Sequence, residues 1–464
     1  MAGDGKKKIL ILGGGFGGIY TAIHLEKHLG REIHRHIEPE ITLVNRDNFF
    51  LFTPMLHEVA ASDVEPTNIV NPVRHLLKKA NFVSGEVRKI NLDSKTVSVA
   101  HGFDGHVHET PYDFLVIALG SVTNFYNTPG LMERALTMKT LGDAFMLRNR
   151  LIALLEEADT ECAAAQRNAL LTVVVAGGGF AGVETMGAVN DFVRESHPYY
   201  RNVPKSAVRM VLVHAGKVIL PELGPELGEY ADAKLRERGV EIFTGVKVTG
   251  ATNEGVTLSN GMFIPARTIV WTAGVSPDPL VGTLGCRLDH GRIIVNEFLE
   301  VPGYPGVFAL GDCAMIPNIR EGGAQPPTAQ HALREGKTCA QNILADLTGG
   351  ARRPFTFSTL GRLAAIGRRA GVAKILGMKF SGWFAWFLWR TIYLSKLPRF
   401  EKKIRVAFDW TLDLLFPKDL VQYQTFRSKS MPGDDEAMEK LGLTGHENRD
   451  RAARVEPQPA PTSV

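Results

Sequence analysis

Residues 176–184 read A-G-G-G-F-A-G-V-E, and residues 13–18 contain nearly the same string, G-G-G-F-G-G. Each string follows an apolar run, K-I-L-I-L at 8–12 and L-T-V-V-V-A at 171–176. A helical pattern follows both strings, and a second apolar strand follows each helix. Strand, glycine turn, helix and strand in this order are typical of a doubly wound α/β domain. The sequence therefore predicts an α/β fold with two Rossmann-like dinucleotide-binding domains.

The elements expected around the two glycine strings come in the same order in both halves of the chain. They are helices at about 19–29 and 183–194, second strands at 41–44 and 208–213, and third strands at 113–120 and 269–275. A further buried strand, G-V-F-A-L-G-D at 306–312, ends in an acid, and a helix is expected over 326–343 because two prolines open it. This order indicates a duplication at the scale of a whole domain.

Both glycine strings fit the pattern G-x-G-x-x-G. The first glycine permits a tight turn, the second lets the backbone approach a pyrophosphate, and the third lets the helix pack on the strand. The helix N-terminus then holds phosphates with its free N–H groups and its dipole. The pattern is met by Gly13, Gly15 and Gly18, and again by Gly177, Gly179 and Gly182. The alternative, two turns that only let helices pack, is disfavoured because both matches lie between a strand and a helix.

Two such sites in one chain imply two nucleotides, most simply a bound FAD and a visiting NAD(P)H that gives its hydride to the flavin. A dinucleotide fingerprint places Asp or Glu at the end of the second strand, but here Asn45 and His214 stand there. Asn45 can still hydrogen-bond ribose hydroxyls. His214 lacks the charge that repels a 2′-phosphate, and Lys217 is nearby. NADH is therefore favoured, and NADPH stays open.

Several longer segments resemble the type II NADH dehydrogenases, single-chain FAD enzymes that pass electrons from NADH to membrane quinone. The resemblance covers roughly residues 7–415. Besides the glycine strings it rests on N-F-F-L-F-T-P-M-L-H-E-V-A at 48–60, W-T-A-G-V at 271–275, G-V-F-A-L-G-D at 306–312 and P-P-T-A-Q at 326–330. It implies a peripheral membrane flavoprotein oxidoreductase that does not pump protons. FAD would be its bound cofactor, NADH or NADPH its substrate and a membrane quinone its acceptor, and a homodimer is plausible from the family.

The resemblance also implies roles for single residues. Asp312 corresponds to the acid that binds the FAD ribityl chain, and helix capping is the alternative role. Glu184 corresponds to the catalytic glutamate at the nicotinamide side of the flavin, where it would orient nicotinamide or relay protons to quinone. Its alternative role is to stabilise the helix dipole from the first turn. The other cofactor-binding residues that we expect are Phe16, Gly17, Arg46, Ala118, Gly120, Gly311, Ala329, Phe180, Ala273 and Gly274.

Ala329 and Gln330 begin a segment that resembles the family's quinone-site motif, A-Q-x-A-x-Q-Q. Here Arg334 and Glu335 replace the last two glutamines. We expect Gln330 and Arg334 to contact quinone, with Arg334 hydrogen-bonded to a quinone carbonyl or neutralising a quinol anion. An ion pair between domains is the alternative role for Arg334.

Two segments near the C-terminus contain many aromatic residues with basic residues among them. They are K-F-S-G-W-F-A-W-F-L-W-R-T-I-Y-L-S-K at 379–396 and the segment at 399–416. Such residues favour an anionic membrane interface. We expect two amphipathic helices on a membrane, in contact through Trp383, Trp386, Trp389, Arg390, Lys402 and Lys403. An ordinary core helix pair or a dimer interface is the alternative. No nucleic acid is expected as a partner, because the rest of the chain is a net-acidic redox body.

Charge and cysteine usage indicate the compartment. Residues 351–430 contain 16 Lys and Arg against 4 Asp and Glu, whereas the rest of the chain contains 37 against 45. A basic C-terminal segment is thus attached to an acidic body. The four cysteines show neither disulfide nor metal-ligand spacing, and the first apolar run is too short for a signal peptide. We therefore expect peripheral attachment to the cell membrane on its cytoplasmic side.

These observations predict five regions in the chain. The FAD-binding domain comprises 1–120 and 285–350, and the NAD(P)H-binding domain comprises 121–284. A membrane-associating region spans 351–430, and a disordered tail spans 431–464. Two other functions stay open. A sulfide:quinone oxidoreductase needs a cysteine pair beside the flavin, and a low-turnover redox sensor is motivated by the altered positions 45, 214 and 334–335.

Overall fold

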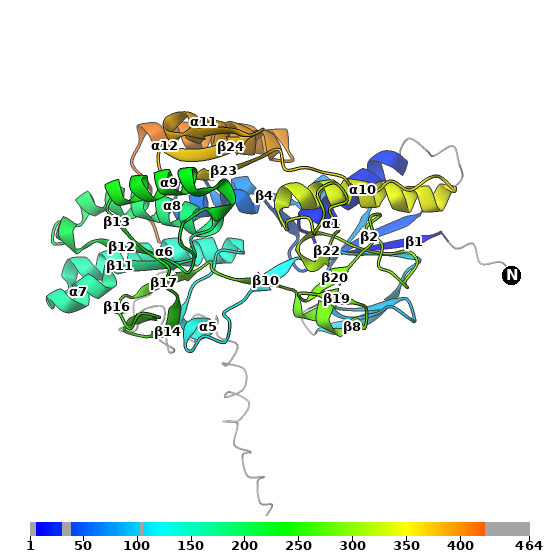
Figure 1. The fold of residues 1–464 in the computed structure, drawn as a ribbon, viewed down its shortest axis with the longest axis horizontal. Helices are drawn as coiled ribbons and strands as arrows, with labels where there is room; N and C mark the ends of the chain where they lie inside the picture. The colour runs from blue at the N-terminus through cyan, green and yellow to red at the C-terminus, as the bar shows by residue number, and fades with distance from the viewer. Residues whose placement is uncertain (1–5, 30–38, 103–104, 423–464) are drawn as a thin grey trace, which may run out of the picture.

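The computed structural model describes residues 6–29, 39–102 and 105–422, and Figure 1 shows their arrangement. The tail expected at 431–464 lies outside the described residues. Two parallel sheets form the centres of two α/β domains that lie side by side, with a smaller C-terminal unit above the second domain.

The first sheet is parallel throughout, and β1 lies at its centre. Its strands, in spatial order, are β21 (Val307–Ala309), β9 (Phe114–Ile117), β1 (Lys8–Leu12), β2 (Glu40–Asn45) and β5 (Asn81–Ser84). Four of the five β1 residues are buried, as expected for a strand covered on both faces. Because β21 pairs with β9, the chain returns to the first sheet after it has completed the second.

The second sheet is also parallel and repeats this plan. Its order is β13 (Val240–Thr244), β12 (Arg209–His214), β11 (Thr172–Ala176) and β17 (Thr268–Trp271). All five residues of β11 are buried. The longer helices of this domain are α6 (Leu141–Thr160), α7 (Ala164–Leu170), α8 (Phe180–Ser196) and α9 (Pro225–Glu237). A capping box between Thr140 and Asp143 begins α6.

Shorter elements complete the two domains. In the first they include β3 (Phe49–Leu51), α2 (Leu56–Ala60), α3 (Pro66–Ile69), β4 (Val70–Pro72), α4 (Val73–Leu76), β6 (Glu86–Asn91), β7 (Thr96–His101), β8 (His106–Pro111), β19 (Leu288–Asp289), β20 (Arg292–Ile294) and β22 (Ala314–Met315). In the second they include α5 (Leu131–Arg134), β14 (Val248–Thr252), β15 (Gly255–Leu258) and β16 (Phe263–Pro265). The antiparallel pair β10 (Ser121–Thr123) and β18 (Val275–Pro277) bridges the two domains.

Three helices begin at residues other than those predicted. The first glycine-turn helix is α1 (Phe16–Leu29), and both α1 and α8 begin three residues before the predicted starts. The early turns contain glycines, which are poor helix formers, so local propensity does not reveal them. The helix predicted at 326–343 is α10 (Ala329–Thr348), which begins after Thr328, so the two prolines precede the helix and do not open it.

The C-terminal unit contains a sheet that the sequence analysis missed. Its three antiparallel strands are β23 (Gly361–Ala365), β24 (Gly371–Ile375) and β25 (Met378–Ser381), followed by α11 (Gly382–Lys396) and α12 (Phe400–Leu415). Figure 1 places this unit next to α8 and α9 of the second domain. α11 packs on β24, and α12 packs on α3 of the first domain.

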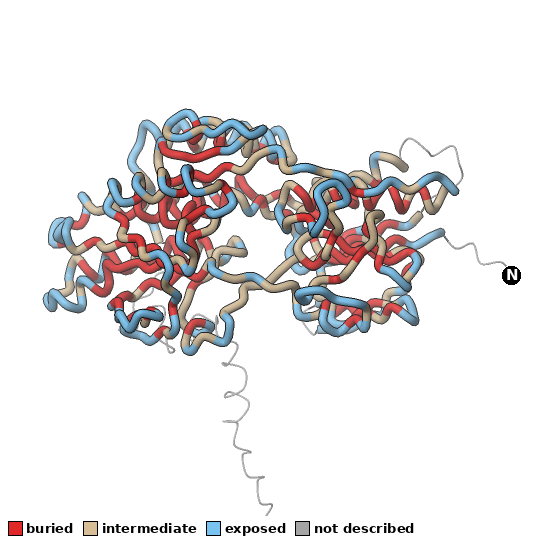
Figure 2. The backbone as a smooth tube through the Cα atoms, viewed as in Figure 1, coloured by how far each residue is buried: buried red, intermediate tan, exposed pale blue. Residues whose placement is uncertain are grey.

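Several residues that were expected to contact a membrane are buried; Figure 2 shows the backbone coloured by burial. Trp389 is fully buried, and Trp386, Arg390 and Lys402 are at most 8% exposed, so none of the four can face a lipid surface. Trp383 is exposed and Lys403 is half-buried. The exposed large apolar residues of these helices are instead Trp383, Phe384 and Phe387 on α11 and Phe400, Ile404, Phe408, Leu412, Leu414 and Leu415 on α12. The sequence pattern did not separate the aromatic residues that pack inward from those that face outward.

Among the helices of the described residues, none is both long enough and apolar enough to cross a membrane.

Candidate active site

The first glycine turn lies at the carboxyl end of β1. Gly13 has φ +102°, and a Cβ atom there would lie 2.3 Å from the carbonyl oxygen of Ala118. At Gly18 a Cβ would lie 1.9 Å from the oxygen of Gly13, so only glycine lets α1 approach the strand this closely. Gly15 has no atom within 4 Å of its Cβ position. The outer face of the turn is therefore open, as a bound pyrophosphate requires.

The second glycine turn repeats this geometry at the end of β11. Gly177 has φ +122°, and its Cβ would lie 2.5 Å from the hydroxyl oxygen of Thr272. At Gly182 the Cβ would lie 1.8 Å from the oxygen of Gly177, whereas Gly179 again faces open space. The first N–H groups of α1 and α8 have no partner within their helices. The residues present thus fit a dinucleotide at each turn.

Asn45 and His214 hold equivalent positions at the ends of β2 and β12, and each supports a glycine turn. The Asn45 side-chain oxygen accepts from the Gly14 N–H at 2.8 Å, and His214 Nδ1 accepts from the Gly178 N–H at 3.1 Å. Burial is the largest cause of a lowered His214 pKa. A neutral His214 fits its role as an acceptor at Nδ1. The sequence analysis considered a ribose contact for Asn45 and the choice between NADH and NADPH for His214, and it missed this support.

Asp312 lies in a short turn directly after β21, at the same sheet edge as the first glycine turn. Its Oδ2 accepts from the Ser121 hydroxyl at 2.7 Å, and Lys139 Nζ donates to Ser121 Oγ at 2.8 Å. Glu335 Oε2 accepts from the Gly311 N–H at 2.8 Å. Ser121, Lys139 and Glu335 were not assigned to this site from the sequence. A helix-capping contact of Asp312 is not among its hydrogen bonds to the described residues.

The other expected cofactor residues lie around the two turns. Phe16 packs edge-on against Phe50 at 5.0 Å between ring centroids, and a Cβ at Gly17 would meet Leu310. Ala118 is buried against Gly13, and Gly120 and Gly311 both have positive φ. Arg46 is exposed, Ala329 begins α10, and Phe180 begins α8. Ala273 follows the end of β17, and a Cβ at Gly274 would lie 2.5 Å from the Tyr126 ring.

Glu184 lies deeper in α8 than the sequence indicated. Because α8 begins at Phe180, Glu184 is outside the first turn, so the helix-dipole explanation fails. Its side chain is buried, and Oε1 accepts from Trp389 Nε1 at 2.9 Å and from the Ala365 N–H at 3.2 Å. Burial raises the pKa of Glu184 to about 8. The glutamate therefore faces the C-terminal unit and is largely protonated at neutral pH.

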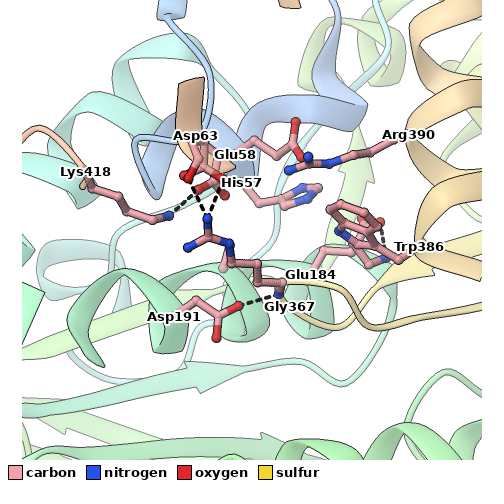
Figure 3. A pocket seen from close by; sticks show the side chains of 13 residues that line it. His57, Glu58, Asp63, Glu184, Asp191, Gly367, Trp386, Arg390 and Lys418 are labelled. Atoms are coloured by element: carbon pink, nitrogen blue, oxygen red, sulfur yellow. Dashed lines mark hydrogen bonds and ion pairs between the residues drawn. The ribbon is translucent and has the colours of Figure 1, made fainter. Parts of the chain in front are cut away.

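A second buried glutamate, Glu58, lies close to Glu184 (Figure 3). It belongs to α2, and its Oε2 accepts from Trp410 Nε1 at 3.0 Å. Burial, the largest cause, raises the pKa of Glu58 to about 8. The ring of its neighbour His57 lies edge-on to the Trp389 ring, with 5.4 Å between the ring centroids. Burial lowers the His57 pKa to about 3. The sequence analysis quoted the segment that holds Glu58 but gave the residue no role.

At the start of α10, the structure does not support the alternative role of Arg334, an ion pair between domains. Among the described residues Arg334 forms no ion pair; its Nη1 donates to the Gln330 carbonyl at 2.7 Å, and its guanidinium lies 4.0 Å from the Phe357 ring centre. Gln330 Nε2 donates to the Gly361 carbonyl at 3.3 Å. Both side chains thus lie at the junction of α10 with β23, and Glu335 lies apart from them beside Asp312.

The four cysteines carry free thiols. Cys162 is exposed, whereas Cys313 and Cys339 are buried. Burial raises the pKa of Cys313 to about 12, so this thiol is not a nucleophile at neutral pH. No group of His, Cys, Asp and Glu in the described part of the chain could hold a metal ion.

Comparison with known proteins agrees with this geometry. Residues 7–336 match the pyridine nucleotide-disulphide oxidoreductase family, and residues 360–419 match the NDH2 C-terminal domain. The chain is 33% identical to the type II NADH:quinone oxidoreductase Ndh of Mycobacterium tuberculosis over 88% of both proteins. It is 34% identical to the demethylphylloquinone reductase NdbB of Synechocystis, over 88% of this chain and 96% of that protein.

A solved structure of NDH2 from Plasmodium falciparum in complex with NADH has the same fold. The TM-score is 0.82 at 19% sequence identity, and the match covers 90% of this chain and all of that one.

Proposed function

The chain belongs to the type II NADH:quinone oxidoreductase family, and from this membership we propose that it oxidises NADH through a bound FAD and reduces a membrane quinone. The observation that carries the proposal is the pair of glycine turns whose middle residues, Gly15 and Gly179, face open space. Each turn stands at the carboxyl edge of a parallel sheet, where α/β domains bind nucleotides.

FAD, when bound, supplies the chemistry that accepts a hydride and passes its electrons to a quinone. The chain would hold this group with the turn at 13–18 and with Asp312. Ser121 donates to Asp312, and Lys139 donates in turn to Ser121, so these two bonds hold the Asp312 side chain in place. Gly311 and Gly120 carry no side chain, so the backbone at these two positions could approach FAD directly.

NADH would bind at the second turn. Its pyrophosphate would meet the N-terminus of α8, and His214 would keep that turn in place through Gly178. His214 has no carboxylate that would repel a 2′-phosphate. Because burial lowers its pKa, its positive charge is also disfavoured and would attract a 2′-phosphate little. We therefore propose NADH as the main substrate, with less discrimination against NADPH than an acidic residue would give.

Glu184 would act between the nicotinamide side and the quinone. Its carboxyl group is protonated near neutral pH and lies against Trp389 of α11. A carboxylic acid in this state can give a proton to a reduced quinone and recover it. Gln330 and Arg334 would line the approach of the quinone, where α10 meets β23.

The exposed apolar residues of α11 and α12 would attach the protein to the cytoplasmic side of a membrane. Phe400, Ile404 and Phe408 are more than half exposed and recur every four residues, which places them on one face of α12. Trp383, Phe384 and Phe387 add aromatic surface on α11. Lys396 and Arg405 are exposed basic residues of the same helices and would meet anionic headgroups.

The experiment is an anaerobic titration of the purified, FAD-loaded chain. NADH should bleach the flavin absorbance, and a short-chain quinone should restore it. A flavin that stays oxidised with both NADH and NADPH would refute the proposal. Steady-state turnover of several per second would exclude the low-turnover sensor. Sulfide-dependent quinone reduction in the absence of NADH would instead favour the sulfide enzyme.

A further inference from the structure

We propose that the polar pocket in Figure 3 is the route by which a proton enters from solvent during quinone reduction, with Glu58 and Glu184 at its inner end. The inference rests on the proposed function. NADH, quinone and one proton give NAD⁺ and quinol. The hydride carries two electrons and one proton, so the second proton of the quinol must come from water.

The inner end of the pocket is an acid pair held by tryptophans. Trp389 donates to one oxygen of Glu184, and Trp410 donates to one oxygen of Glu58. Neither carboxyl forms an ion pair within 4 Å among the described residues. The guanidinium of Arg390 lies over the rings of Trp386 and Trp410, at 4.1 and 4.7 Å from their centres. The two acids can therefore release a proton without breaking a fixed ion pair.

Four buried polar atoms that line this pocket have no hydrogen-bond partner in the described part of the chain. They are His57 Nε2, Arg368 Nε, Arg390 Nε and Asp413 Oδ1. Buried polar atoms are nearly always satisfied, and ordered water serves where protein groups do not. The cavity volume that water can occupy is about 20 Å³, and roughly 10–15 Å³ is enough for one molecule. The pocket is thus built to hold water between its charged groups.

The outer end of the pocket reaches the surface through paired charges. Lys418 Nζ donates a hydrogen bond to the Asp63 carboxylate and lies 3.9 Å from Glu195 Oε2. Arg368 lies 2.9 Å from Glu195, and these two side chains are 28% and 32% exposed. Asp63 follows Glu58 in the chain, and its N–H donates to the Glu58 carbonyl at 2.8 Å. These charged groups come from the turn after α2, from α8 and from the C-terminal unit, and they form the outer part of the proposed route.

Every element packed around the acid pair contributes a charged or titratable group. The helix α2 gives His57, the turn after α2 gives Asp63, and α8 gives Asp191. The loop after β23 gives Arg368, α11 gives Arg390, α12 gives Asp413, and the segment after α12 gives Lys418. Of these, Asp63 and Asp413 act on Glu58 as like charges, and Arg390 acts on it as the opposite charge. Changes at Asp413 should therefore alter proton delivery without touching either nucleotide site.

The test is stopped-flow kinetics of three FAD-loaded variants, Glu58→Gln, Glu58→Asp and Asp413→Asn, with Glu401→Gln as a control on the exposed face of α12. Flavin reduction by NADH should keep its native rate in all four. Flavin reoxidation by a short-chain quinone should slow at least tenfold in Glu58→Gln and severalfold in Asp413→Asn. Its pH profile should shift, and a small weak acid such as azide should restore the rate. Glu58→Asp should retain most of it.

Native reoxidation rates in both Glu58→Gln and Asp413→Asn would overturn the route. So would equal slowing of both half-reactions without rescue by azide, because that pattern indicates a purely structural role. If the native protein fails to reduce quinone at all, the proposed function fails, and this outcome is distinct from either result in the variants.

Discussion

The indole of Trp389 donates to Glu184 at 2.9 Å, across the boundary between the C-terminal unit and the second nucleotide domain. Trp410 makes the matching bond to Glu58 of the first domain, at 3.0 Å. One C-terminal unit is thus hydrogen-bonded to a buried acid in each nucleotide domain. Trp389 was expected on a membrane surface, but together with Trp410 it completes the polar site between the domains.

Trp389→Phe should destabilise the fold and raise the pKa of Glu184. The substitution keeps most of the ring volume but removes the N–H donor that lowers the Glu184 pKa. We expect that pKa to rise. The free energy of unfolding should fall by about 0.5–1.5 kcal/mol, the net contribution of one hydrogen bond, because the Ala365 N–H still donates to the same oxygen. Urea unfolding measures the loss. Trp383→Phe, at an exposed site on the same helix, should leave the midpoint unchanged, and equal effects of the two would contradict the prediction.

Stability should fall as pH rises from about 5 to 8. Burial raises the pKa of both Glu58 and Glu184 to about 8, above the ordinary value of 4.5. Between these values the folded protein binds more protons than the unfolded chain, so a rise in pH favours unfolding. Each group contributes up to about 1.4 kcal/mol per pH unit. Thermal unfolding at pH 5 to 9 checks this, and a Glu58→Gln, Glu184→Gln double variant should show a shallower slope. An unchanged slope would place the pH dependence elsewhere.

The sequence predicted most strands of the two parallel sheets, β21 among them, because these strands are apolar runs, several of which end in glycine. It did not predict the edge strands β5 and β13. The role of Asp312 in FAD binding stays a prediction. It missed β23 to β25, whose residues carry Gly, Arg and Lys and whose burial depends on α11 packing over them. An alternation of apolar and polar residues over so few positions does not distinguish such a sheet from a loop.

The polar site between the domains depends on long-range contacts that local patterns do not contain. Glu58 and Trp410 are 352 positions apart in the chain, and Glu184 and Trp389 are 205 apart. Nothing near Trp389 in the sequence marks it as inward-facing, because Trp383 has the same aromatic and basic neighbours. Only the packing of α11 against β23 and α2 decides which face is buried.

Glu335→Ala should weaken FAD binding. Glu335 is buried on α10, and its Oε2 accepts the Gly311 N–H that fixes the turn carrying Asp312. Loss of the acceptor leaves that N–H without a partner, at a cost of about 1–3 kcal/mol. Glu335→Gln retains an acceptor oxygen and should bind more nearly like the native protein. Reconstitution of the FAD-free protein, followed by flavin fluorescence, measures the affinity. Lys337→Gln, exposed on the same helix, serves as the control, and equal affinities for all three variants would refute the role.

Alanine substitutions at matched glycines should assign one nucleotide to each turn. Gly15→Ala and Gly179→Ala add a methyl group that meets no protein atom within 4 Å, so both variants should fold with a native melting temperature. The methyl group would instead enter the space expected for a pyrophosphate. Gly15→Ala should then lower the affinity for FAD at least tenfold. Gly179→Ala should raise the KM for NADH by a similar factor and leave the FAD content native.

Gly182→Ala completes the comparison, because its methyl group would lie 1.8 Å from the Gly177 oxygen and should destabilise the fold itself. FAD content, KM for NADH and melting temperature, measured on all three variants, separate the roles. If Gly179→Ala released FAD and Gly15→Ala changed only the KM, the two nucleotides would be assigned to the wrong turns. If Gly182→Ala melted like the native protein, close approach of α8 to its own turn would not explain the third glycine.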